Sequence, residues 1–216
     1  MTQAFLCYSL KVMYRYLKTA VPAEIIINKS RFIACLFALA DAKEVATIIA
    51  QLKKQHPKAD HFCYGYIIDE NRSQKYSDDG EPQKTAGWPI LDVLLKNDID
   101  NCLAVVIRYY GGIKLGAGGL TRAYRNAVAQ AVNSSLFIEM ITTPLYSISV
   151  DYTLNDRLFN LLKNQAVITR QEFKEKVEYE FYCFDDELIG TINNLTAGIV
   201  PLIIDYIKIE KNKTSS

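Results

Sequence analysis

The chain has 216 residues, 50% of them apolar and 23% charged, and its 25 Lys plus Arg nearly balance its 24 Asp plus Glu, giving a net charge of +1. A disordered chain would be less apolar and more unbalanced in charge, and a disulfide-stapled miniprotein would be shorter, so both classes are excluded. No apolar run approaches the ~20 residues that a membrane-spanning helix requires.

Cysteine usage and the first residues indicate a cytoplasmic protein. The five cysteines are an odd number at wide spacing without a CxxC pair, which is typical of a reducing compartment. The apolar stretch at residues 4–10 lacks a basic segment before it and a cleavage pattern after it, so no signal peptide is predicted. We therefore expect a soluble, cytoplasmic chain without a membrane partner.

Strands and helices alternate in the first part of the chain. Asp41 and Glu44 form a capping box that begins a helix, and Pro57 ends it. A nearly continuous apolar run before Tyr110 is typical of a central strand. The predicted strands span residues 23–28, 31–39, 61–69 and 103–110, the predicted helices residues 41–56 and 120–136, and a polar loop residues 70–88.

The second part switches between periods of two and about 3.6, which indicates strands and helices in turn. Asn155 is predicted to cap one helix, Asp185 and Asp186 open another, and Gly198 follows its end. The order βαββαβ predicts a ferredoxin-like domain, a fold that serves many functions. The predicted elements are a strand at 145–154, a helix at 155–164, strands at 166–170 and 176–184, a helix at 185–196 and a strand at 200–209.

The charge is unevenly distributed along the chain. Residues 1–137 carry 17 basic and 12 acidic side chains, a net +5, whereas residues 138–216 carry 8 and 12, a net −4. We predict a division near Phe137, with either Met1 or Met13 as the start. The expected parts are an amino-terminal extension (1–19), a first domain (20–137), a ferredoxin-like domain (138–210) and a frayed tail (211–216).

No carboxylate lies between Asp100 and Glu139, although four basic residues do. Such a field favours an anionic partner. The alternative is that a buried strand and a buried helix leave little room for acids.

Five of the ten glycines lie within nine residues, between the predicted strand at 103–110 and the helix at 120–136. Glycine lets a ligand approach backbone amides, and a helix amino terminus favours an anion. The segment lacks the GK[ST] of a P-loop and the spacing of a dinucleotide motif, so an anion or nucleic-acid contact and mere tight packing remain alternatives. The candidate binding residues are Arg108, Tyr109, Tyr110, Gly111, Gly112, Lys114, Gly116, Gly118, Gly119, Arg122 and Arg125.

The polar loop carries a second candidate site. Three carboxylates within four residues, Asp78, Asp79 and Glu81, can hold a hard cation or act as general acid and base. They can equally cap backbone amides or pair with Arg108, and no EF-hand spacing is present. The residues of this candidate polar site are His61, Asp78, Asp79, Glu81, Lys84 and Thr85.

The sequence predicts no metal, no cofactor and no catalytic residue. His56 and His61 are the two histidines, and they stand five apart across Pro57, so they cannot share a helix face as a zinc pair would. No Cys or Glu completes a ligand set, and no GxSxG elbow is present.

Several segments, taken together, are similar to the IMPACT family in its bacterial YigZ-like branch. They are SRFIA at residues 30–34, His56-Pro57 with His61 and Cys63, DDGEPQKTAGWPIL at residues 78–91 and RYYGGIKLGAGGLTRAY at residues 108–124. The resemblance covers about residues 20 to 137 and extends to the second part in pattern alone.

The resemblance implies an α+β fold of two domains: an amino-terminal α/β sandwich like domain 2 of ribosomal protein S5 and domain IV of EF-G, and a ferredoxin-like βαββαβ domain like domain V of EF-G. Both parallels imply RNA or the ribosome as a partner. Eukaryotic relatives regulate translation through a kinase pathway with an additional RWD domain, so that kinase role is not expected here. The family usually reads GEPxGTAG, and Lys84 replaces its glycine, which either narrows the site or adds a contact.

The leading hypothesis is a non-catalytic, RNA- or ribosome-binding regulator of translation that can also contact a translation-related protein, with no signal specific to DNA. One alternative is an enzyme that acts on a small phosphorylated or anionic substrate through the two loops. A second alternative is a protein-interaction module.

Overall fold

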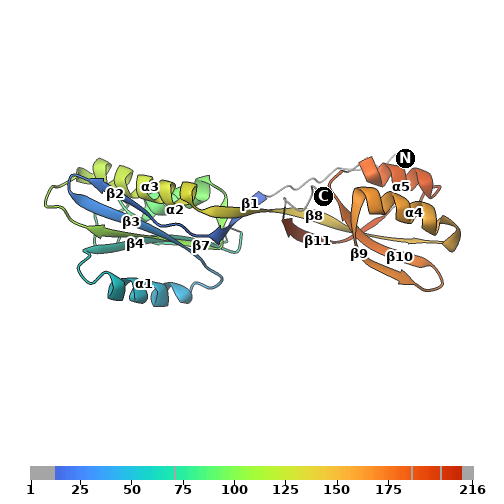
Figure 1. The fold of residues 1–216 in the computed structure, drawn as a ribbon, viewed down its shortest axis with the longest axis horizontal. Coiled ribbons are helices and arrows are strands. Elements are labelled where there is room, and N and C mark those ends of the chain that lie inside the picture. The colour runs from blue at the N-terminus through green and yellow to red at the C-terminus, as the bar shows by residue number, and fades with distance from the viewer. Residues whose placement is uncertain (1–12, 71, 186, 200, 211–216) are drawn as a thin grey trace. The chain divides into compact units, whose positions relative to one another are not determined.

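A computed structural model describes residues 13–70, 72–185, 187–199 and 201–210 (Figure 1). The chain forms two compact units: an amino-terminal unit of residues 14–139, and a carboxyl-terminal unit that contains residues 140–210. The first twelve residues of the predicted extension and the predicted tail at 211–216 lie outside the described residues.

The amino-terminal unit combines seven strands and three helices among its described residues. They are β1 (Met13–Thr19), β2 (Ala23–Ile27), β3 (Ser30–Ala38), α1 (Glu44–Gln55), β4 (His61–Ile68), β5 (Ser73–Ser77), α2 (Gly87–Lys96), β6 (Ile99–Asp100), β7 (Cys102–Tyr109) and α3 (Gly116–Ser134).

An antiparallel sheet of five strands, in the order β2-β3-β7-β4-β5, forms the middle layer of this unit. Helices α2 and α3 cover one face and α1 covers the other (Figure 1). Side chains of β7 alternate between two buried layers: Ala104 and Val106 pack towards α2 and α3, whereas Val105 and Ile107 pack towards α1. The central strand predicted from the continuous apolar run is therefore confirmed.

β5 lies within the polar loop predicted at residues 70–88, and α2 and the two-residue β6 lie mostly where no element was predicted. β5 is a polar edge strand, so it lacks the apolar alternation that reveals a strand. α2 buries six of its ten residues, carries Asp92 and Lys96 as its only charged residues and begins with Gly87-Trp88-Pro89, which is typical of a loop in the sequence.

The predicted extension at residues 1–19 also differs from the structure. Residues from Met13 to Thr19 form β1, which pairs in parallel with the two-residue strand β6, Arg15 standing opposite Ile99. The Arg15 guanidinium also lies 4.6 Å from the centre of the Phe137 ring. These partners are more than 80 residues away along the chain, so no local pattern predicts the strand.

The carboxyl-terminal unit has the sheet order β11-β8-β10-β9, with antiparallel neighbours. Helices α4 and α5 pack on one face of this sheet over Tyr179 and Phe181 (Figure 1). This is the ferredoxin-like arrangement, and the predicted α+β class is confirmed. The elements are β8 (Leu136–Val150), α4 (Tyr152–Gln165), β9 (Ala166–Phe173), β10 (Val177–Cys183), α5 (Glu187–Leu195) and β11 (Leu202–Glu210).

The predicted cap of α4 is wrong. The helix begins three residues earlier, with Asp151 at the N-cap position, and Asn155 lies in its first turns. The Asn155 side chain instead accepts a hydrogen bond of 2.6 Å from the Tyr179 hydroxyl. Asparagine favours helix caps, but Asn155 serves here as the hydrogen-bond acceptor for the hydroxyl of a core tyrosine.

Candidate functional site: a buried ion pair beside a cationic glycine loop

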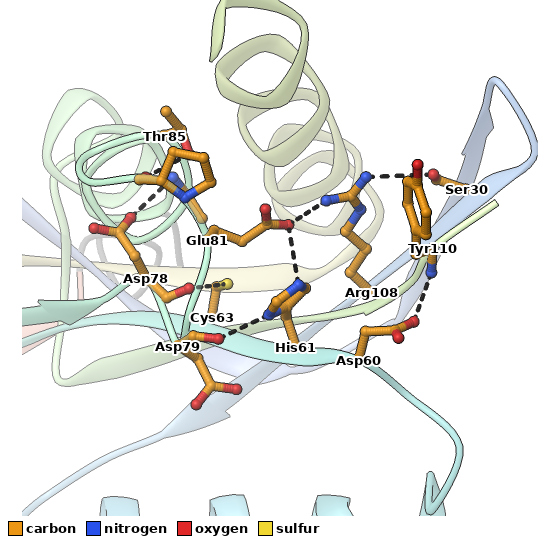
Figure 2. Close-up of polar contacts among 12 residues, drawn as sticks. Ser30, Asp60, His61, Cys63, Asp78, Asp79, Glu81, Thr85, Arg108 and Tyr110 are labelled. Atoms are coloured by element: carbon orange, nitrogen blue, oxygen red, sulfur yellow. Dashed lines mark hydrogen bonds and ion pairs between the residues drawn. The ribbon is translucent and has the colours of Figure 1, made fainter. Parts of the chain in front are cut away.

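The candidate polar site lies at the end of the sheet from which the chain passes towards α3. Ser30, His61 and Arg108 project from β3, β4 and β7 on the face that α2 and α3 cover, because strand residues alternate between faces. His61 stands directly opposite Arg108 in the β4–β7 pair. The loop between β5 and α2 brings Glu81 to these side chains (Figure 2).

One oxygen of Glu81 is the centre of the cluster. Its Oε1 accepts a hydrogen bond from Arg108 Nη1 at 2.5 Å and lies 4.0 Å from His61 Nε2 (Figure 2). It also accepts a hydrogen bond from the Tyr124 hydroxyl at 2.6 Å. The side chains of Glu81 and Arg108 are 4% and 5% exposed. Because a buried charge needs an opposite charge and hydrogen bonds, this ion pair is a structural element of the fold.

Arg108 is held on its other sides as well. Its Nη2 donates to Ser30 Oγ at 3.4 Å, and its guanidinium carbon lies 5.3 Å from the ring centres of both Phe32 and Tyr110. Ser30 Oγ also accepts from the Gly111 amide at 3.1 Å. The ion pair therefore connects β3, β7 and the start of the glycine loop.

Cys63 and Tyr124 lie beneath the ion pair, and burial raises the pKa of both groups well above their ordinary values. The Cys63 thiol donates to the Asp78 carbonyl at 2.9 Å. The nearby Glu81 carboxylate adds to both pKa shifts. A thiol of this kind is protonated at neutral pH and is a poor nucleophile.

Asp78 caps the loop and the start of α2. One oxygen of its carboxylate accepts hydrogen bonds from the backbone amides of Ala86 and Gly87, at 3.0 and 2.8 Å. The other oxygen accepts a hydrogen bond from the Lys84 amide at 2.8 Å. Both oxygens are therefore used inside the protein. Thr85 adds a hydroxyl bond of 2.6 Å to the Pro82 carbonyl.

Asp79 has a similar inward role. Its carboxylate accepts from the Phe62 amide at 2.7 Å, and its backbone carbonyl accepts from His61 Nδ1 at 2.8 Å. Because a carbonyl only accepts, Nδ1 carries a proton and Nε2 is the nitrogen that faces Glu81. The structure thus brings the predicted acidic residues together, but around backbone amides, a histidine and an arginine.

Lys84 differs from its neighbours because its side chain is exposed and its backbone has φ of 62°. Glycine adopts this left-handed conformation without a steric penalty, whereas other residues are strained there. Backbone geometry therefore explains why the family that this chain resembles usually has glycine at this position. In this chain the exposed Lys84 side chain places a positive charge on the surface.

The glycine loop, residues 111–119, has glycines with two different constraints. A Cβ on Gly111 would lie 2.1 Å from the Lys29 carbonyl carbon, so a side chain there would force the backbone to shift where the loop crosses the β2–β3 turn. Gly112 and Gly116 have φ of 81° and 69°. A Cβ on Gly118 would meet only the end of the Arg122 side chain, at an ordinary 3.5 Å. Packing therefore explains Gly111 but leaves Gly118 unexplained.

The basic residues around the loop divide into paired and unpaired groups. Arg108 is paired with Glu81, and Arg125 with Asp92 at 2.9 Å. Lys114 and Arg122 are exposed and make no ion pair with any described residue.

The structure adds Lys29 to this unpaired group. It is exposed in the β2–β3 turn that Gly111 touches, and it too makes no ion pair within the described part of the chain. Because the turn lies more than 80 residues before the loop, sequence spacing gave no signal for it. The first turn of α3 contains no acid and has no side-chain cap.

The three tyrosines near the loop occupy different environments. Tyr124 is fully buried and Tyr110 is 45% exposed. Tyr109 is on the α1 face, where its hydroxyl lies 2.8 Å from His56 Nδ1. Stacking of a base on Tyr124 is therefore excluded, and Tyr110 is the exposed ring beside the loop.

The described residues contain neither a cluster of metal ligands nor a membrane-spanning helix. Among them, no group of three or more His, Cys, Asp or Glu side chains is arranged to hold a metal ion. None of the helices they form is both long enough and apolar enough to cross a membrane.

Fold and site together define an α+β protein whose amino-terminal sandwich presents a cationic, glycine-rich loop beside a buried Glu81–Arg108 ion pair. The profile of the Impact N-terminal domain matches residues 28–132. The chain is 42% identical over 176 residues to the IMPACT family member YvyE of Bacillus subtilis (strain 168), covering 81% of each chain. It is 34% identical over 161 residues to YigZ of Escherichia coli (strain K12), covering 72% of this chain and 76% of the relative.

The chain belongs to the IMPACT family, which confirms the resemblance seen in its motifs. Among solved structures, a crystal structure of a hypothetical protein has a TM-score of 0.56 and 26% identity, covering 89% of this chain and 98% of that one.

Proposed function

We propose that this protein is a cytoplasmic RNA- or ribosome-binding regulator of translation, without catalytic activity, which contacts phosphates through the glycine loop. The observation that carries the proposal is the set of unpaired cations, Lys29, Lys114 and Arg122, around the amino terminus of α3. The translational role is what the resemblance to the IMPACT family implies, and membership of that family supports it.

The chemistry of the loop suits a phosphate backbone. The first amides of a helix have no partner within the helix, and together with the helix dipole they favour an anion. Cations without acidic partners add attraction that depends on salt, as contacts to phosphates do. Gly118 leaves the backbone open where packing would accept a side chain.

The groups that a catalytic alternative would use are engaged elsewhere. The Asp78 and Asp79 carboxylates accept hydrogen bonds from backbone amides, and Glu81 neutralises the charge of Arg108. A general acid or base must reach a substrate, and these carboxylates are directed into the fold. This arrangement favours binding over catalysis.

The test is binding of a fluorescent RNA hairpin, and of purified ribosomes, across a salt series. Reversal of both Lys114 and Arg122 to Glu should weaken hairpin binding by at least about tenfold. It should also make the negative slope of the log binding constant against log salt concentration shallower by about two. Reversal of Lys54 and Lys163, which are exposed on α1 and α4, is the matched control.

Two results would contradict the proposal. One is an absence of binding to the hairpin and to ribosomes at low salt. The other is an equal loss of binding in the control variant, which would indicate attraction by net charge rather than by the loop. A partner that survives nuclease and high salt would instead support the protein-interaction alternative.

A further inference from the structure

The two faces of the amino-terminal sheet are covered unequally. Five strands at about 4.8 Å spacing span roughly 19 Å, whereas a helix with its side chains is about 10 Å wide. Two helices, α2 and α3, cover one face, and α1 alone covers the other (Figure 1). One helix cannot cover the whole face, and a groove of about 490 Å³ lies beside α1, along β4 and β5.

The floor and one wall of this groove are apolar. Tyr66, of which 7% is exposed, and Val45 belong to the core beneath it. Three exposed alanines form the wall: Ala42 in the turn before α1, and Ala46 and Ala50 on α1 itself. The lining residues are Ala42, Val45, Ala46, Ile49, Ala50, Lys53, Tyr64, Tyr66 and Lys75.

Both rims of the groove carry positive charge. Lys53 projects from α1, with its ammonium 5.4 Å from the centre of the Phe62 ring. Lys75 projects from β5 opposite Tyr66, and therefore on the groove face of the sheet. Neither lysine makes an ion pair with a residue that the structure describes, and the lining contains no acid.

We propose that this groove docks an acidic amphipathic helix of a partner protein. Alanines along α1 permit a second helix to approach to the usual interaxial distance of 8–10 Å, where it would complete the layer as the second helix does on the opposite face. Its apolar side chains would cover Ile49 and Tyr64, which are half-buried in the lining. Its carboxylates would meet Lys53 and Lys75, which is the charge complementarity that selects an acidic partner.

An RNA occupant fits these observations less well. Bases need exposed ring faces to stack on, and Tyr66 is buried. Alanine methyl groups offer nothing to sugars or phosphates. The groove also lies on the face of the sheet opposite to Glu81 and Arg108, so this inference does not depend on RNA binding by the glycine loop.

The test uses the full chain and two fluorescein-labelled helical peptides of 18 residues. Both have leucines along one face; one carries Glu on the other face and the second carries Lys. We expect the acidic peptide to bind at least about tenfold more tightly, and the Lys53→Glu, Lys75→Glu double variant to reverse the preference. Lys54→Glu, Lys58→Glu is the charge-matched control outside the groove, and it should retain at least half of the tenfold preference.

Two further variants separate the groove from other sites. Ala46→Trp adds a bulky side chain at an exposed helical position, so it should abolish binding of the acidic peptide while the thermal unfolding midpoint stays within a few degrees. Lys114→Glu, Arg122→Glu should leave peptide binding unchanged, which distinguishes this proposal from the one for RNA.

Three results would overturn the inference. The first is equal binding of the acidic and basic peptides. The second is displacement of the acidic peptide by an RNA hairpin whose own binding requires Lys53 and Lys75, which would assign the groove to RNA. The third is concentration-dependent dimerisation that Ala46→Trp abolishes, which would assign it to a second copy of the chain.

Discussion

The acidic loop at residues 78–85 and the glycine loop at residues 111–119 both join a strand to a helix, and both are rich in groups that bind ligands. They use those groups in opposite directions. The carboxylates of the first loop turn inwards to backbone amides and to Arg108. The cations around the second loop are exposed and make no ion pair with the residues that the structure describes. The difference teaches that a charged side chain without an ion-pair partner, and not the residue type alone, identifies the loop that is able to bind a ligand.

Removal of Glu81 should have the largest effect on the acidic side of this comparison. Glu81→Ala leaves the Arg108 charge buried and unpaired, so the free energy of unfolding should fall by about 3–5 kcal/mol, measured by urea denaturation. Lys114→Ala with Arg122→Ala should change it by less than about 1 kcal/mol, because exposed, unpaired cations contribute little.

A second variant tests the cause of that loss. Arg108→Met in the Glu81→Ala background should recover much of the stability, since no buried charge remains. If Glu81→Ala alone changes the free energy of unfolding by less than about 1 kcal/mol, the ion pair is not a structural element and the two loops are more alike than we conclude.

Replacement of single glycines by alanine should have different effects on stability at different positions of the glycine loop. Gly111→Ala places a Cβ against the Lys29 backbone and should cost about 1–3 kcal/mol or more. Gly118→Ala meets no such obstacle and should stabilise α3 by up to about 1 kcal/mol. Thermal unfolding of both variants checks this prediction; equal losses would show that packing constrains Gly118 as it does Gly111.

Loss of the Asp78 cap should have a moderate effect that is local at first. Asp78→Ala removes the acceptor of three amides and should cost about 1–2 kcal/mol. Trp88, the single tryptophan, is the second residue of α2, so its fluorescence reports fraying there. Asp78→Asn keeps one carbonyl acceptor and should lose less. An unchanged Trp88 signal in Asp78→Ala would show that the cap does not hold the helix.

The smallest effect is expected at Lys84. Lys84→Gly relieves the left-handed backbone and should raise the free energy of unfolding by about 0.5–1 kcal/mol. Lys84→Ala, which removes the charge but keeps the strain, should show no gain. An equal gain in both variants would point to the lysine side chain, and not to its backbone, as the source of strain.

Local patterns predicted much of the fold. The continuous apolar run predicted β7, because a strand that is buried on both faces is apolar throughout. The alternation of apolar and polar residues predicted β10, because that strand is buried on one face. α2 was missed because it is short and begins with Gly87-Trp88-Pro89, which is typical of a loop, and β5 because it is polar. β1 was missed because its partner is distant in the chain.

The candidate site followed the same division. The sequence by itself determined the motifs that place this chain in the IMPACT family, the glycine-rich approach to α3 and the absence of acids around it. The tertiary structure alone decided that Glu81 neutralises Arg108, that Asp78 caps α2, that Tyr124 is buried and that Lys29 joins the cations of the loop. Composition records how much charge a chain carries, but the partner of each charge depends on which distant segments the sheet brings together.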